Sequence, residues 1–136
     1  MVDFIEWNND FFLNNKEIDN HHQRLFEIIN QLYSAVLESI HESKLEQIIE
    51  ELFQYSFYHF EYEEDLFARY NYKYTYEHVK QHEMFTDKVK DFNIKLVMED
   101  KKLYLEILNF IKDWIQKHIP FIDKKFVEFM KAGQIG

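Results

Sequence analysis

The chain has 136 residues and no cysteine, and its 25 acidic residues outnumber 16 basic residues to give a formal net charge of −9. The lack of cysteine excludes disulfides, thiolate metal sites and iron–sulfur clusters. An acidic chain without a basic cluster is a poor candidate for binding nucleic acid or an anionic membrane surface. With only 2 glycines and 1 proline, little in the chain interrupts helices, so we predict an all-α protein.

The predicted architecture is an antiparallel up-down-up-down four-helix bundle with an N-terminal arm and a short C-terminal helix. We expect one domain spanning residues 1–136, with the arm over residues 1–17 and the bundle and closing helix over 18–131. The first residues have neither the basic nor the apolar segment of a secretory signal, and no apolar run has the length of a membrane span. We therefore expect a cytoplasmic protein.

The first predicted helix follows the arm, which Trp7 is expected to pack against the bundle. Asp19 is the expected N-cap of this helix. Leu25 and Ile29 belong to an apolar stripe at helical spacing. His22 lies three residues before Leu25 and therefore continues the stripe inward.

The second predicted helix begins with a sequence at Ser43 that fits a capping box. His59 and Glu63 lie four residues apart on its apolar stripe, where core residues would be expected. A carboxylate in that position is costly unless it is paired or bound to a metal. The other acidic residues between positions 61 and 65 are out of register with His59 and are typical of a solvated face.

The third predicted helix follows a turn over residues 69–74, and Thr75 is its expected cap. Its inward stripe begins with His78 and His82, again four residues apart. This pair alone is a weak signal, because such pairs also occur on solvated faces. It lacks the Glu that follows the first His in a zinc metalloprotease motif. A turn over residues 98–101 leads to the fourth helix, which presents Trp114 and His118 on its inward face.

Pro120 is expected to bend or end the fourth helix, because proline removes a backbone donor and clashes with the preceding turn. On a straight helix, side chains five residues apart, such as those of His118 and Asp123, would point about 140° apart. A break at Pro120 would allow both side chains to face one site. We expect residues 121–132 to form the short closing helix and residues 132–136 to be a frayed tail.

Taken together, these residues predict a metal centre. Each histidine alone could be an ordinary hydrogen-bonded core residue or a surface residue. The alternative to a metal centre is therefore a purely structural bundle that binds no metal. Jointly, every predicted helix presents a histidine on its inward stripe. Of the two remaining histidines, His21 is rotated about 100° from His22 and is expected to face solvent or a neighbour. His41 lies in the connection between the first two helices. The seven candidate ligands are His22, His59, Glu63, His78, His82, His118 and Asp123.

A set of five imidazoles and two carboxylates suits Fe, Mn or Zn. Seven groups are too many for one ion. If Glu63 and Asp123 each bridge two ions, and an oxo or hydroxo group bridges them as well, each metal gains three ligands. Five histidines shared three and two then make one metal six-coordinate and the other five-coordinate. One open position remains for a small ligand.

The sequence resembles the hemerythrin family, specifically its single-domain bacterial members. The resemblance runs from about Trp7 to Lys131. Its motifs are residues 18–22 (Ile-Asp-Asn-His-His), 59–63 (His-Phe-Glu-Tyr-Glu), 78–82 (His-Val-Lys-Gln-His) and 114–123 (Trp-Ile-Gln-Lys-His-Ile-Pro-Phe-Ile-Asp). His21 replaces the Gln that the family usually has just before its first ligand. The stripe with Leu25 and Ile29 selects His22 as the ligand.

The resemblance implies two iron ions per chain, bridged by an oxo or hydroxo group, Glu63 and Asp123. It implies that His78, His82 and His118 hold the six-coordinate iron. His22 and His59 would hold the five-coordinate iron, where the family binds O2 reversibly. We expect the pocket over the open position to be formed by Leu25, Phe60, Trp114, Ile115, Ile119 and Ile122.

The function expected on this basis is reversible O2 binding for transport, storage or buffering, without enzymatic activity. The predicted pocket leaves no histidine, lysine or carboxylate to act as a general acid, which weighs against catalysis. Alternatives that use the same centre are sensing of O2, redox state or iron, and reduction of peroxide or NO. The expected partner is O2, with an O2-consuming or electron-transfer protein as a further partner. A chain this rich in surface charge is expected to be a monomer.

Overall fold

A computed structural model describes residues 3–40, 42–96 and 101–135, and all the regular structure within them is helical. Within these residues, five α-helices follow one another, with a π-helical segment, η1, between the last two. The elements are α1 (Lys16–Leu37), α2 (Glu42–Arg69), α3 (Thr75–Leu96), α4 (Lys101–Lys117), η1 (His118–Asp123) and α5 (Lys124–Ile135). None of the described helices is both long enough and apolar enough to cross a membrane.

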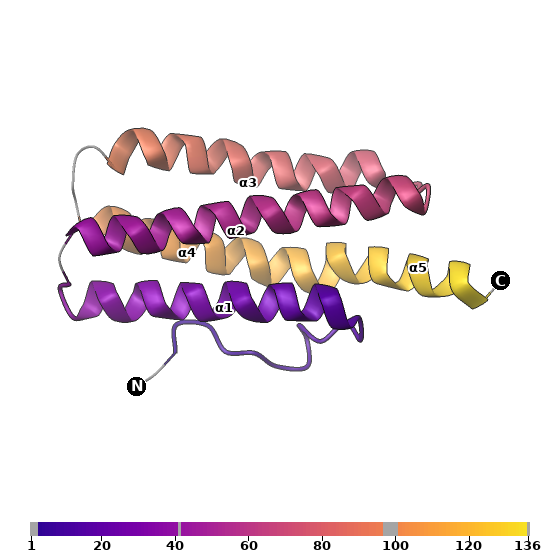
Figure 1. Cartoon of the computed structure of the whole chain (residues 1–136), viewed down its shortest axis with the longest axis horizontal. Coiled ribbons are helices and arrows are strands. Elements are labelled where there is room, and N and C mark those ends of the chain that lie inside the picture. The colour runs from indigo at the N-terminus through magenta and orange to yellow at the C-terminus, as the bar shows by residue number, and fades with distance from the viewer. Residues whose placement is uncertain (1–2, 41, 97–100, 136) are drawn as a thin grey trace.

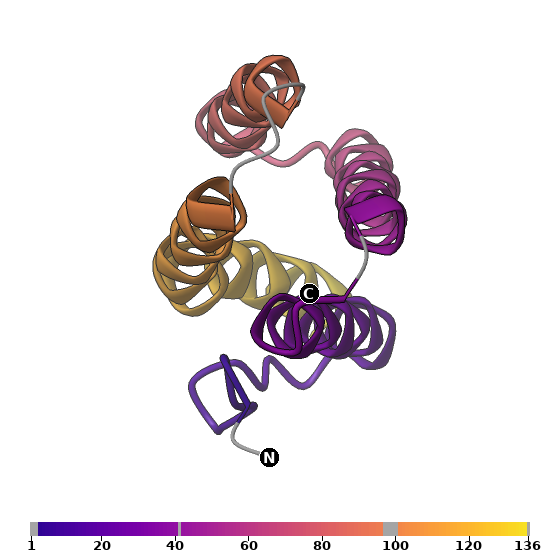
Figure 2. The same cartoon turned by 90° about the vertical axis from the view of Figure 1, so that its left-hand side faces the viewer.

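The first four helices form the predicted antiparallel bundle, in which successive helices run in opposite directions (Figure 1). Contacts join α1 to α2, α2 to α3, α3 to α4 and α4 back to α1. Figure 2 shows these four helices around a common centre, with α5 departing from the axis of α4. The all-α architecture with an arm and a short closing helix is therefore confirmed.

The start of α1 differs from the prediction. Its N-cap is Asn15, whose side-chain oxygen accepts a hydrogen bond from the backbone N–H of Ile18. Asp19 lies inside the first turn instead, with a buried carboxylate that accepts from the N–H of Leu13 at 3.0 Å and of Asn15 at 3.1 Å. The carboxylate therefore ties the arm to the helix rather than capping it. The sequence alone does not distinguish these roles, because Asn and Asp are equally good N-caps.

The starts of α2 and α3 also differ in detail from the starts predicted from the sequence. Because α2 begins at Glu42, Ser43 lies within its first turn rather than ahead of it. Thr75 is the first residue of α3, and its hydroxyl donates to the carbonyl oxygen of Tyr72 at 2.6 Å. His41 and residues 98–100 of the predicted turn lie outside the described residues.

The arm runs along α1 (Figure 1) and is fastened by polar and aromatic contacts. Ile5 and Asn30 exchange two hydrogen bonds, from the Ile5 N–H to Oδ1 at 3.0 Å and from Nδ2 to the Ile5 carbonyl at 2.9 Å. The ring of Trp7 packs edge-on against Phe26, with centroids 5.2 Å apart. The predicted packing of Trp7 against the bundle is therefore present.

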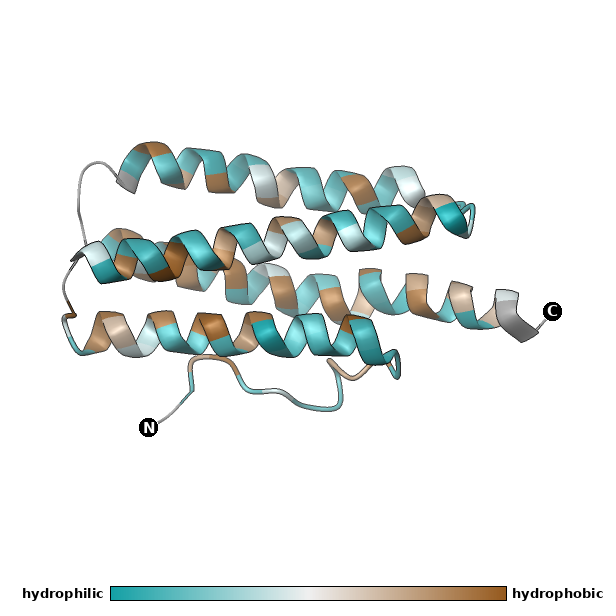
Figure 3. Cartoon of the chain, in the orientation of Figure 1, coloured by the Kyte–Doolittle hydropathy of each residue, from teal (hydrophilic) through white to brown (hydrophobic). Residues whose placement is uncertain are grey.

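The core consists largely of aromatic and branched aliphatic side chains, which alternate with hydrophilic residues along every helix (Figure 3). Full burial of one large apolar side chain of this kind stabilises the folded state by about 1.5–3 kcal/mol. The largest completely buried aromatic residues are Phe53, Phe67, Phe85, Phe92 and Phe126.

The bend expected near Pro120 takes the form of η1. A proline at this position has no N–H to donate to the preceding turn. The N–H of Lys124 donates to the carbonyl of Ile119, five residues back, which is the hydrogen bond of a π-helix. The closing helix expected over residues 121–132 is α5, which begins at Lys124 and continues through the residues up to 135 that we expected to fray.

The two hydrogen bonds of Asp19 generate a prediction. Replacing Asp19 with Ala leaves the N–H groups of Leu13 and Asn15 without acceptors, so we expect unfolding to become easier by about 2–4 kcal/mol. The measurement is urea denaturation of the metal-free protein. Glu17, an exposed acid in the same helical turn, provides the control: Glu17→Ala should change stability by less than about 1 kcal/mol. Equal midpoints for the two variants would contradict the role assigned to Asp19.

Candidate metal centre

The structure brings all seven predicted ligand side chains into one buried layer of the bundle. Each of the five histidines is at most 2% exposed, and Glu63 and Asp123 are completely buried. One histidine comes from α1, a His and a Glu from α2, two histidines from α3, and a His and an Asp from η1. The i,i+4 spacing in α2 and α3 aims both side chains of each pair at the bundle axis.

The seven side chains divide into two groups that share both carboxylates. One group contains Glu63, Asp123 and three histidines, and the other contains the same carboxylates and two histidines. Within each group, the candidate ligand atoms all lie within 4.8 Å of one another. The three histidines are His78, His82 and His118, and the two are His22 and His59.

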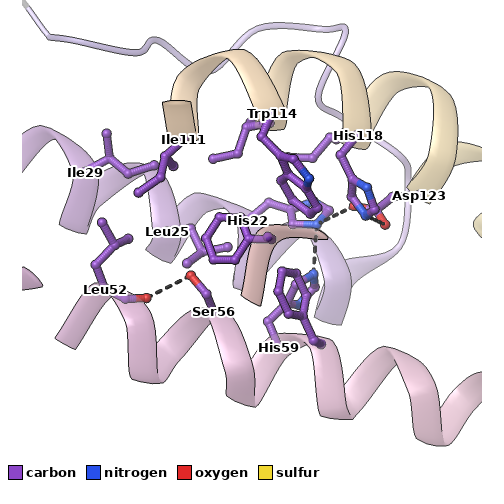
Figure 4. Close-up of a pocket in the computed structure, with 14 residues that line it drawn as sticks. His22, Leu25, Ile29, Leu52, Ser56, His59, Ile111, Trp114, His118 and Asp123 are labelled. Atoms are coloured by element: carbon purple, nitrogen blue, oxygen red, sulfur yellow. Dashed lines mark hydrogen bonds and ion pairs between the residues drawn. The ribbon is translucent and has the colours of Figure 1, made fainter. Parts of the chain in front are cut away.

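The imidazoles direct their Nε2 atoms towards the carboxylates. Oδ1 of Asp123 lies 2.9 Å from Nε2 of His78 and 3.0 Å from Nε2 of His118, whereas Oδ2 lies 3.1 Å from Nε2 of His22. The two oxygens of Asp123 therefore face different groups. Figure 4 shows His22 between His59 and Asp123.

Glu63 is also shared between the groups, but through one oxygen. Its Oε1 lies 3.2 Å from Nε2 of His59 and 3.3 Å from Nε2 of His82. Adjacent ligands on an octahedral ion with bonds of about 2.1 Å are separated by about 3.0 Å. The observed separations therefore fit atoms that surround a common ion.

Unpartnered polar atoms provide a test of whether these residues fit metal ions. Both carboxylate oxygens of Glu63 and Oδ2 of Asp123 are buried without a hydrogen-bond donor. Nε2 of His82 is likewise buried without a hydrogen bond. Buried polar groups are rarely left unpaired, and an anion in this state is especially costly. Cations between the carboxylates and imidazoles would pair these atoms, so the donor set fits.

The electrostatic surroundings keep both carboxylates ionised. Burial raises the pKa of Asp123, but the surrounding histidines, His118 first, outweigh burial and hold it well below its usual range. Burial and the neighbouring Asp123 raise the pKa of Glu63, whereas His59 and His82 lower it, for a net value of about 2. Ionised carboxylates are the form that binds metal.

Two of the histidines differ in basicity. Burial lowers the pKa of His118 to about 4, against the opposing effect of Asp123. Burial also acts to lower the pKa of His82, but the neighbouring carboxylates of Glu63 and Glu64 raise it to about 9.

Comparison with known proteins identifies the family. A family model described as the hemerythrin HHE cation binding domain matches residues 14–130. A Bacteriohemerythrin of Clostridium acetobutylicum is 36% identical over 126 residues, covering 90% of this chain and 98% of that protein. This chain belongs to the hemerythrin family. Membership and the buried cluster together support a metal-binding role of the hemerythrin type.

Further relatives agree with this placement. A Bacteriohemerythrin of Pseudomonas aeruginosa is 29% identical over 125 residues, covering 92% of this chain and 80% of that protein. A solved structure described as wild-type hemerythrin has a TM-score of 0.76 and 21% sequence identity, covering 92% of this chain and 96% of that one. At that identity, the structural likeness shows the shared fold.

A small cavity of about 20 Å³ adjoins the cluster, which is room for about one small molecule. Five of the six predicted pocket residues line it, namely Leu25, Phe60, Trp114, Ile115 and Ile119. Its wall also contains residues that we did not predict, namely Ile29, Leu52, Ser56, Phe85 and Ile111. Several of these are labelled in Figure 4.

Ile122, the sixth residue predicted for the pocket, is not among the residues that line this cavity. In an α-helix, Ile122 would lie one turn after His118 and share its face. The wider turn of η1 brings Asp123 to that face instead, and Ile122 is rotated to a half-buried position. The π-helical turn therefore places Asp123, and not Ile122, on the face of the cluster.

Two polar residues outside the predicted set make polar contacts with candidate ligands. His21, expected to face solvent or a neighbour, is buried and faces a neighbour: its Nδ1 lies 2.9 Å from Nδ1 of His59. Oε2 of Glu64 lies 2.9 Å from Nδ1 of His82. Glu64 follows Glu63 directly and was expected to be solvated. Both contacts cross between helices, so no spacing within one helix indicates them.

Aromatic rings fix the orientation of two imidazoles among the seven candidate ligands. Trp114 stacks on His118, with centroids 4.0 Å apart and planes inclined by 14°. Phe60 stacks on His82 at 4.1 Å and 13°. Rotation of either imidazole would require its stacking partner to move, so the rings are held with Nε2 facing the cluster.

This geometry generates a prediction about metal binding. Adding Fe2+ anaerobically to chelator-treated protein should raise the free energy of unfolding by about 2.7 kcal/mol or more, once free metal exceeds the dissociation constant a hundredfold. Glu63→Ala should abolish most of this gain, because both groups share Glu63. Thermal unfolding with and without Fe2+ measures the gain.

The exposed Glu61, which lies in the same acidic run, supplies the matched control. Glu61→Ala should retain the full gain in stability. If Glu63→Ala retains it as well, Glu63 is not part of the metal site.

Proposed function

We propose that this hemerythrin binds O2 reversibly at a di-iron centre. His78, His82 and His118 would hold one iron, and His22 and His59 the other. Glu63 and Asp123 would bridge the two, together with an oxo or hydroxo group. Two irons held in this way can give electrons to O2 on binding and recover them on release. The proposal rests on the shared carboxylates and on the unequal histidine sets.

The unequal histidine sets leave one open position. Each iron would have three ligands from the two carboxylates and the bridging oxygen. Three imidazoles complete six ligands on one side, whereas two imidazoles make five on the other. The open position would therefore lie at the two-histidine side.

The position of the cavity carries the proposal. Both members of the two-histidine set, His22 and His59, line the cavity. From the three-histidine set, only His118 does so among the described residues. This small cavity thus adjoins the side of the cluster where the ligand count leaves an opening. Its volume suits a diatomic molecule.

The cavity wall favours binding over turnover. Apart from the proposed ligands, the described wall contains two polar side chains, Ser56 and Trp114. The Ser56 hydroxyl donates to the carbonyl of Leu52 at 2.8 Å (Figure 4), so its proton is already engaged. A wall without an available acid protects bound O2 from protonation. Transport, storage or buffering of O2 is the role that such a site supports.

The partners proposed for this role are O2 and an O2-consuming or electron-transfer protein that receives it. The net charge of −9 argues against nucleic acid as a partner. We propose a monomer that acts in the cytoplasm.

Reversible binding predicts a spectroscopic cycle. After anaerobic reconstitution with two Fe2+ per chain, a visible charge-transfer band should appear when air is admitted and disappear on degassing, over repeated cycles. Optical spectra with iron analysis measure this. Rapid, irreversible conversion to the diferric state would contradict O2 carriage and favour a redox enzyme or a sensor. Failure to bind two irons would contradict the di-iron centre itself.

The cavity predicts the effect of a filling substitution. Leu25→Phe adds volume to the cavity wall, and overpacking of this kind costs about 1–3 kcal/mol. If the added ring occupies the space for O2, the affinity for O2 should fall by about tenfold or more, and the protein should still bind both irons. Oxygen equilibrium curves provide the measurement.

Ile94→Phe is the matched control, because Ile94 is 75% exposed on α3. This variant should keep the affinity of the original protein. Unchanged affinity in Leu25→Phe would show that O2 does not occupy this cavity.

A further inference from the structure

His21 stands behind the candidate ligand His59. It is 7% exposed, and its Nδ1 lies 2.9 Å from Nδ1 of His59. The other ring nitrogen of His59, Nε2, lies 3.1 Å from Nε2 of His22 and faces the cluster. The imidazole of His59 is therefore held at both ends, by the cluster on one side and by His21 on the other.

The direction of the hydrogen bond follows from the chemistry of imidazole. If Nε2 of His59 gives its lone pair to a metal, Nδ1 must carry the proton and act as a donor. Nδ1 of His21 must then accept with its lone pair, which places the proton of neutral His21 on Nε2. One tautomer of each ring satisfies the contact.

Three tyrosines hold His21 in this position. Their ring centroids lie 4.7 Å (Tyr62), 5.4 Å (Tyr58) and 6.0 Å (Tyr55) from that of His21. All three come from α2, the helix that also carries His59. The acceptor is therefore positioned by packing against the helix that carries His59.

A contact of the same kind on the other side of the cluster has a different chemical character. His82, from the three-histidine set, has its Nδ1 2.9 Å from Oε2 of Glu64. A carboxylate behind a histidine ligand raises the basicity of the imidazole and strengthens its bond to the metal. A neutral imidazole in that place polarises the ligand less. The two metal positions thus differ in histidine number and in the charge of the acceptor behind a ligand.

We propose that His21 is a positioning residue that orients His59 towards the two-histidine position, and that its neutral acceptor, set against the carboxylate of Glu64, makes this the weaker metal position. The metal there would be loaded last and lost first. The inference rests on the two-metal assignment proposed above and adds to it an order of occupation.

Two substitutions separate the hydrogen bond from the packing. His21→Phe keeps a planar ring among the tyrosines but has no acceptor. His21→Asn places a carbonyl oxygen near the position of Nδ1 and so restores an acceptor. Both variants are to be compared with the original protein by calorimetric titration with Zn2+, which has no redox chemistry.

The original protein should bind two Zn2+ per chain with unequal affinities. His21→Phe should weaken the second binding event by about 10–100-fold and leave the first within about twofold, and His21→Asn should recover most of the loss. Glu64→Gln, which keeps an acceptor but removes its charge, is the matched control and should weaken the first event instead.

A second readout needs no variant. In the Zn2+-loaded protein, 15N NMR of the imidazoles should show the proton of His59 on Nδ1 and that of His21 on Nε2. A proton on Nδ1 of His21 would overturn the proposal even if His21→Phe does not fold.

The outcomes also separate this inference from the proposed function. If the original protein fails to bind two metals, the di-iron assignment fails. If it binds two, and His21→Phe loses nothing or loses equally at both positions, only the role of His21 is overturned.

Discussion

The structure depends on the complete burial of two carboxylates at the centre of the bundle. Glu63 and Asp123 are shielded from water and lie beside the Nε2 atoms of five imidazoles, and three of their four oxygens have no hydrogen-bond donor. Such an arrangement is costly unless cations occupy it. The remaining features follow from this constraint: four helices supply the ligands, aromatic rings stack on the imidazoles, and the apolar core on either side excludes water.

Periodicity explains why much of the centre is readable from the sequence. His59 with Glu63, and His78 with His82, lie four apart on stripes of core residues, so their burial and convergence follow from helix geometry alone. Contacts between helices do not follow from spacing. His21 and Glu64 each hold Nδ1 of a candidate ligand on another helix, and no pattern within α1 or α2 reports this. The N-cap of α1 was misplaced because both Asn15 and Asp19 are suitable caps.

The fourth and fifth helices show why the wide turn of η1 is needed. The core stripe of α4 passes through Ile111 and Ile115 and reaches His118, and that of α5 includes Phe126 and reaches back to Asp123. Each stripe therefore ends in a candidate ligand. In one continuous α-helix, residues 118 and 123 would point about 140° apart, and one of the two stripes would face solvent.

One extra residue in the turn removes this conflict. The hydrogen bond from Lys124 to Ile119 spans five residues, so a residue and its fifth successor share a face. His118 and Asp123 then converge at 3.0 Å, while both helices keep their apolar faces on the core. Pro120 favours this turn, because it has no N–H with which to continue the α-helical pattern. Metal-ligand geometry and core packing are thus satisfied by the same backbone feature, the π-helical turn between α4 and α5.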